Sequence, residues 1–153
     1  MIRLVVAAVL TVATLAAAFP AIDDARGTGT DAALSGATDR IERAGQALAT
    51  SEDATLSRSH AATRRVEFRI PTPSLTTARP SFVAIGGKPG GPGNRSLVAY
   101  GVDSSPTRLR GLSLPVPVRT PEGPVVFEAT GRHAVSLALV GSDGRPALVV
   151  TRG

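Results

Sequence analysis

The feature that most constrains this chain is a long uncharged segment close to its start. Residues 4–22 contain no charged side chain, while Arg3 precedes them and Asp23 and Asp24 follow. A helix of these 19 residues is roughly 28 Å long, close to the roughly 30 Å hydrocarbon core of a bilayer. The segment therefore predicts a transmembrane anchor, formed by Leu4, Val5, Val9, Leu10, Leu15, Phe19, Pro20 and Ile22.

Two fates are open for this segment. It is longer than the apolar core of a typical secretory signal, and Pro20 is unfavourable beside a cleavage site, which favours a retained helix with a cytoplasmic N-terminus. The basic Arg3 and the alanines at 16–18 also fit a cleaved signal peptide. The first alternative predicts a single-pass protein of the cell membrane, and the second a secreted protein.

Composition restricts the chemistry of the remainder. The sequence has no cysteine, which excludes disulfides and thiolate metal ligands. Residues 1–62 hold five Arg against seven acids, whereas residues 63–153 hold 12 basic residues against five acids. This asymmetry indicates an anionic partner, but no basic run exceeds two residues, so ordinary solvated charges are the favoured alternative.

The next segment has the period of an amphipathic helix. A Gly-Thr-Gly-Thr sequence at 27–30 predicts a flexible break, and Thr30 or Asp31 is suited to cap a new helix. Apolar residues then recur at spacings of three and four, which predicts a packing face formed by Leu34, Ala37, Ile41, Ala44 and Leu48. We expect this face to pack on the chain's own sheet, and a helix of another subunit is the alternative.

Beyond a polar linker at 51–63, the pattern becomes strand-like. Residues 64–70 predict a half-buried strand with Val66, Phe68 and Ile70 on one face and Arg65, Glu67 and Arg69 on the other, and Asp143-Gly144 is suited to a hairpin turn. Further strands are predicted at 81–85, 96–102, 108–114, 125–129, 133–140 and 147–151. The predicted fold class is α+β, with a transmembrane helix at 1–26, an amphipathic helix and linker at 27–62, and a small antiparallel β domain at 63–153.

No motif indicates catalysis or cofactor binding. The Gly-rich loop at 86–95 lacks the spacing of a phosphate-binding loop, and His60 and His133 lack metal-ligand spacing. We therefore expect no enzyme activity, cofactor, metal, nucleic acid or small-molecule substrate. Asn94 opens a glycosylation sequon in an exposed loop. A candidate face for an anionic partner is formed by Arg64, Arg65 and Arg69, extended by Arg108, Arg110 or Arg119.

The order of these elements resembles type IV pilins and pseudopilins. The residues that carry the likeness are the apolar run 4–22 with Pro20, the packing face from Leu34 to Leu48, and the strands that begin at Arg64. The chain looks similar to small uncharacterised single-anchor proteins of halophilic archaea that accompany pilus or secretion machinery. The resemblance implies an accessory or minor component of such an assembly, with membrane lipid, pilin-like subunits or a secretion platform as partners. The alternative is a secreted β-rich binding module with a basic face, released by signal-peptide cleavage.

Overall fold

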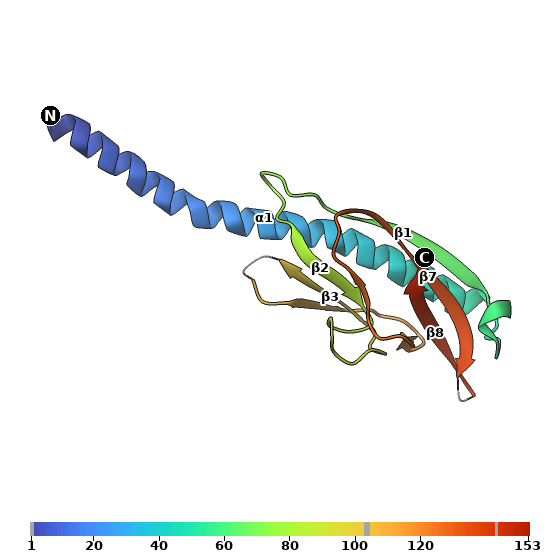
Figure 1. Cartoon of the computed structure of the whole chain (residues 1–153). Coiled ribbons are helices and arrows are strands. Elements are labelled where there is room, and N and C mark those ends of the chain that lie inside the picture. Colours follow the sequence, from blue (N-terminus) through green and yellow to red (C-terminus); the bar gives the residue numbers. More distant parts are fainter. Residues whose placement is uncertain (1, 103–104, 143) are drawn as a thin grey trace.

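The protein consists of one long helix and a head built from two small sheets (Figure 1). This computed structural model describes residues 2–102, 105–142 and 144–153. Helix α1 spans Ile2–Ser51, and a 3-10 turn, η1, spans Arg58–His60. The strands are β1 Thr63–Ile70, β2 Pro80–Ile85, β3 Leu97–Val102, β4 Arg108–Gly111, β5 Val118–Arg119, β6 Val125–Phe127, β7 Gly131–Ser142 and β8 Arg145–Arg152. The C-terminal half of α1 lies in the head, and its N-terminal half projects from it (Figure 1).

The helix is continuous through residues 27–30, so the predicted flexible break is wrong. Gly29 serves close packing rather than flexibility, because a Cβ atom there would overlap the Thr76 carbonyl oxygen. A Cβ atom at Gly27 would make an ordinary contact, 3.5 Å from the Arg108 guanidinium group. Contacts with the head thus offset the low helix propensity of glycine.

The first sheet has the strand order β1-β7-β8-β5. Strands β1, β7 and β8 pair antiparallel, and the β7–β8 register ends at Ser142 opposite Arg145. This register and the φ of 73° at Gly144 confirm the predicted hairpin, although Asp143 lies outside the described residues. The predicted antiparallel pairing holds for the other strand pairs, but β5 pairs parallel to β8. Strand β5 was not predicted because its two residues, which lie between prolines, are too few to show a strand period in the sequence.

A second sheet has the order β4-β3-β2-β6, so the head has two sheets where one was predicted. All its pairs are antiparallel, and the register shifts between Pro80 and Phe82 on β2. The sheets meet where the Phe68 ring of β1 contacts the Phe127 ring of β6 edge-on, with centroids 5.3 Å apart. One core therefore joins both sheets and α1.

The predicted packing face of α1 forms part of this core. Leu34, Ile41 and Leu48 are at most 2% exposed, Ala37 is buried, and Ala44 is half-buried against the same cluster. A Cβ atom at Gly45 would lie within 3.0 Å of side chains on Leu114 and Leu148. The expectation that the helix packs on its own sheets is confirmed, and the face is not available to a helix of another subunit.

Candidate functional site

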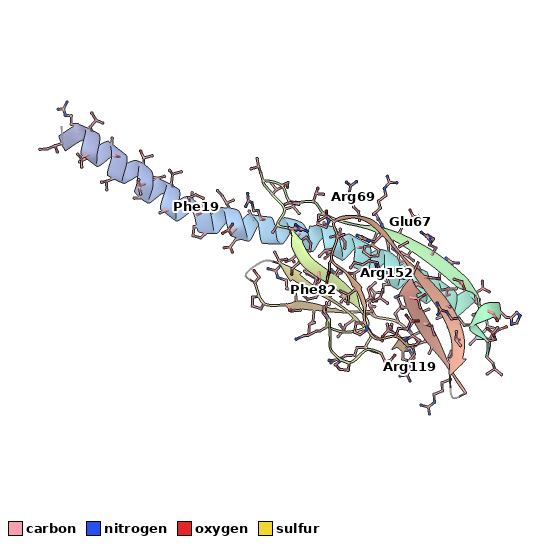
Figure 2. All side chains as sticks on the ribbon, in the orientation of Figure 1. Phe19, Glu67, Arg69, Phe82, Arg119 and Arg152 are labelled. Carbon is pink, nitrogen blue, oxygen red and sulfur yellow. The ribbon has the colours of Figure 1, made fainter. Side chains whose placement is uncertain are left out.

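The N-terminal half of α1 exposes apolar side chains on all its faces (Figure 2). The exposed fraction is 80% at Leu4 and 44% at Ile22. Among the described residues, α1 is the one helix long and apolar enough to cross a membrane, a test that signal sequences near an N-terminus also pass. The other predicted anchor residues are exposed as well, namely Val5, Val9, Leu10, Leu15, Phe19 and Pro20.

The two threonine hydroxyls of the apolar segment are bonded within the helix. The Thr11 hydroxyl donates to the Ala7 carbonyl oxygen at 2.8 Å, and the Thr14 hydroxyl donates to the Leu10 carbonyl oxygen at 2.7 Å. Pro20 lies inside the helix without ending it. Because an unpaired hydroxyl is costly in hydrocarbon, these bonds make the segment compatible with a lipid environment.

The other half of α1 is fastened to the head by its acidic side chains. Asp31 accepts a hydrogen bond from the Tyr100 hydroxyl at 3.0 Å and forms an ion pair with Arg108. Asp39 pairs with Arg110 at 2.9 Å. Arg108 and Arg110 therefore bind the helix and do not extend the candidate basic face. These ion pairs could not be predicted from the sequence because the partners are more than 70 residues apart.

The environment of Tyr100 favours its neutral form. Burial raises the pKa of the Tyr100 hydroxyl above its ordinary value, and the positive charge of Arg110 partly opposes this shift. A neutral hydroxyl is the form that donates a hydrogen bond to Asp31. The contact between β3 and α1 is therefore maintained across the ordinary pH range.

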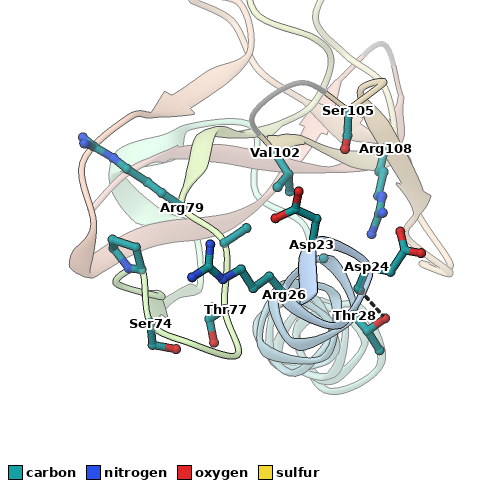
Figure 3. A pocket seen from close by; sticks show the side chains of 13 residues that line it. Asp23, Asp24, Arg26, Thr28, Ser74, Thr77, Arg79, Val102, Ser105 and Arg108 are labelled. Atoms are coloured by element: carbon teal, nitrogen blue, oxygen red, sulfur yellow. Dashed lines mark hydrogen bonds between the residues drawn. The ribbon is translucent and has the colours of Figure 1, made fainter. Parts of the chain in front are cut away.

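A hollow of about 850 Å³ lies where α1 enters the head (Figure 3). One of its sides is the loop between β1 and β2, which is bonded to the helix at three points. The Ala78 amide donates to the Arg26 carbonyl oxygen at 3.3 Å, and the Thr30 hydroxyl donates to the Ala78 carbonyl oxygen at 2.9 Å. The Arg26 Nε donates to the Leu75 carbonyl oxygen at 3.3 Å. Sequence analysis missed this hollow because three separate segments build it.

The candidate basic face lies on the outer side of the first sheet. Strand alternation places Arg65, Glu67 and Arg69 on this side, whereas Arg64 falls on the side of β1 that carries the core residues. Arg69 lies directly opposite Arg132 on β7, and Figure 2 shows Arg69 and Glu67 projecting from the sheet. Arg119 of β5 is exposed on the same face, opposite Val149. The predicted face thus keeps Arg65, Arg69 and Arg119 and gains Arg132.

The sequon residues have a structural role in the folded chain. Asn94 has a φ of 62°, a conformation that asparagine tolerates better than most residues. The backbone amide of Asn94 donates to the Thr120 hydroxyl at 3.0 Å, and the side-chain Oδ1 of Asn94 accepts from the Thr120 backbone amide at 2.8 Å. The Ser96 hydroxyl accepts from the Val118 amide at 3.2 Å. These bonds fasten residues 94–96 to β5 and to Thr120, which follows it, and glycosylation of Asn94 stays a prediction.

The histidines lie far apart in the fold. His133 packs beside Phe68 and Phe127, and its Nε2 lies 2.6 Å from the Ala129 carbonyl oxygen. His60 is exposed in η1. In the part of the chain that the structure describes, no group of three or more His, Cys, Asp or Glu side chains is arranged to hold a metal ion.

Comparison with known proteins identifies a family. The family described as "Domain of unknown function (DUF7311)" matches the chain over residues 1–153, so the chain belongs to this family. No curated protein and no solved structure matches the chain.

Proposed function

We propose that this member of the DUF7311 family is a non-enzymatic surface protein held in a membrane by residues 4–22, with its N-terminus in the cytoplasm and its head outside. The observation that carries the proposal is the exposed apolar half of α1. Each large aliphatic side chain left in water forgoes roughly 1.5–3 kcal/mol of burial free energy. Insertion into lipid recovers this free energy along the whole segment, whereas the head covers none of its most apolar part.

The proposed role is that of an accessory or minor component of a pilus-like or secretion assembly. The order of anchor, packed helix and small β head supports it, as in the pilin-like layout that the sequence resembles. Because the face from Leu34 to Leu48 is occupied by the head, the apolar surface that α1 has for packing against helices of other subunits is the anchor half. The helix is continuous between the two halves, so the anchor also orients the head relative to the membrane.

A secreted binding module is the second candidate, and the basic face favours it. Like charges directly opposite each other on neighbouring strands are destabilising, yet Arg69 faces Arg132 across β1 and β7. Arg65 lies 3.7 Å from Glu67, but both side chains are more than 60% exposed, so this pair contributes little. An anionic polymer or an acidic protein on this face would relieve the repulsion.

Membrane fractionation with intact-mass analysis separates the two candidates. We expect the full-length chain to stay with vesicles after an alkaline carbonate wash, because only an integral segment resists extraction. Release of full-length chain by the wash, or a cytosolic location, would overturn the anchor. A mass that corresponds to a mature chain starting near residues 19–22 would instead support the secreted module.

The assembly role is tested by cross-linking inside the membrane. The chain has no cysteine, so Leu10→Cys introduces a single thiol into the anchor, and Leu56→Cys is the control because Leu56 is 90% exposed beyond the end of α1. We expect a benzophenone attached to the Leu10→Cys thiol to insert, on irradiation, into C–H bonds of neighbouring subunits, which mass spectrometry identifies as pilin-like or as a secretion platform. If the variant stays monomeric in native membranes, the assembly role is wrong and the anchor is unaffected.

A further inference from the structure

We propose that the membrane-proximal end of the head is a phospholipid site, in which Leu75 enters the bilayer interface and Arg26 and Arg79 bind the lipid phosphate. This inference rests on the anchor proposed above, because it assigns a ligand to the surface that the anchor brings against the membrane. Its three supports are the position of one loop, an exposed leucine at the tip of that loop, and the polar hollow beside it.

The position of the loop follows from the helix. Arg26 lies four residues beyond Ile22, the last residue of the apolar run, which corresponds to about 6 Å along the axis at 1.5 Å per residue. The Arg26 Nε bonds the Leu75 carbonyl oxygen, so the loop tip is held at the level where the hydrocarbon-facing segment ends. Figure 1 shows this loop, between β1 and β2, at the end of the head that faces the projecting half of α1.

Leu75 is 84% exposed although its backbone is well held. The Ser74 amide donates to the Thr77 carbonyl oxygen at 2.9 Å and closes a turn around Leu75, and Pro71 and Pro73 stiffen the approach. A large apolar side chain at the tip of a fixed turn gains free energy by entering the membrane interface. The loop therefore supplies a short apolar wedge beside the anchor.

The hollow beside this wedge has the polar groups that a phosphodiester needs. Arg26, Arg79, Ser74 and Thr77 are among the residues that line it (Figure 3). Guanidinium groups bind phosphate oxygens through charge-assisted hydrogen bonds. The volume of about 850 Å³ lies in the range of pockets that hold small ligands.

The acids in the hollow shape its preference. Asp23 and Asp24 line its helix side, and Arg108 is already paired with Asp31. Within the described residues, no ion pair joins either aspartate to Arg26 or Arg79. The site thus places carboxylates next to guanidinium groups, which suits a headgroup that carries a phosphate together with hydrogen-bond donors rather than a bare polyanion.

The wedge is tested with the full chain reconstituted in vesicles of phosphatidylcholine and phosphatidylglycerol. The protein has no tryptophan, so Leu75→Trp introduces a single fluorophore, and Leu56→Trp is the matched control at the opposite end of the head. We expect shallow nitroxide-labelled lipids to quench Leu75→Trp several-fold more than Leu56→Trp. Equal quenching of both, with the chain still floating with the vesicles, would overturn the site but not the anchor, and failure to float would overturn both.

The phosphate contact is tested by arginine side-chain NMR of the full chain in maltoside micelles, which contain no phosphate. We expect added phosphatidylglycerol to shift the Nε–H signals of Arg26 and Arg79 and to leave the signal of the distant Arg145 unchanged. Inorganic phosphate at the same concentration should shift none of them. Equal shifts with inorganic phosphate would make this a soluble-phosphate site, and no shift with either would show that the arginines bind no phosphate. Either result would overturn the lipid assignment.

Discussion

The two halves of α1 share one backbone conformation but have opposite relations to their surroundings. The apolar residues up to Ile22 are exposed on every side, whereas from Gly27 onward a buried residue recurs every three or four positions. The first half is suited to lipid because it offers no polar face, and the second is suited to a protein core because it offers one apolar face and one charged face. A continuous helix can therefore join two media when the sequence changes pattern within about one turn.

The largest expected effect is on the buried face of the second half. Ile41→Asp places a carboxylate where Ile41 is 2% exposed, and we expect the free energy of unfolding to fall by about 4 kcal/mol or more. Ala33→Asp on the exposed face is the control and should cost less than about 1 kcal/mol. Chemical denaturation of the micelle-bound chain, followed by circular dichroism, measures both. Equal stability of the two variants would mean that the helix is a solvated spacer.

A charge introduced into the first half of α1 should weaken membrane insertion and leave the stability of the head unchanged. Val12 lies near the centre of the apolar run and is 66% exposed, and an arginine there should cost about 2.5–3.5 kcal/mol of insertion free energy. We expect Val12→Arg to lower the carbonate-resistant fraction strongly while the head unfolds at the same denaturant concentration. Ala33→Arg, on the same helix but outside the span, should leave the fraction unchanged. A loss of head stability in Val12→Arg would contradict the division of α1 into two independent halves.

Replacing two glycines of α1 by alanine should change the free energy of unfolding in opposite directions, one at the junction of the halves and one beyond it. Gly29→Ala should destabilise the head by about 1–3 kcal/mol, because the added methyl group overlaps the Thr76 carbonyl oxygen. Gly36→Ala meets nothing within 4 Å and should stabilise the helix by about 0.5–1 kcal/mol. Thermal unfolding of the two variants compares them directly. A gain in stability for Gly29→Ala would show that the loop does not pack on the helix there.

The smallest expected effect concerns the bond between Tyr100 and Asp31. Tyr100→Phe should cost about 0.5–1.5 kcal/mol at neutral pH. Because burial raises the pKa of Tyr100, the unfolded chain loses this proton first, so wild-type stability is intact below the ordinary tyrosine pKa of 10.0 and declines above it. The variant should lack this part of the alkaline decline. Denaturation at neutral and alkaline pH measures the difference, and an identical decline in both proteins would contradict the shift.

Sequence periodicity predicted the elements whose signal lies within one segment. The spacing from Leu34 to Leu48 identified the buried helix face, and the alternation from Val66 to Ile70 identified β1, because burial on one side imposes a period on the residues. The same approach failed at residues 27–30, where glycine indicated a break. The contact with Thr76 that accounts for Gly29 comes from a loop nearly 50 residues away.

The amino-acid sequence alone determined that residues 4–22 form an apolar segment, that an amphipathic face follows and that the rest is β-rich, since hydropathy and period are properties of neighbouring residues. Only the tertiary structure decided that α1 is unbroken, that the head has two sheets with a parallel β5, and that Arg108 and Arg110 bind the helix while Arg69 faces Arg132. The hollow near Leu75 is also visible only in the tertiary structure. These features depend on which distant segments meet, and the packing of the whole core selects those meetings.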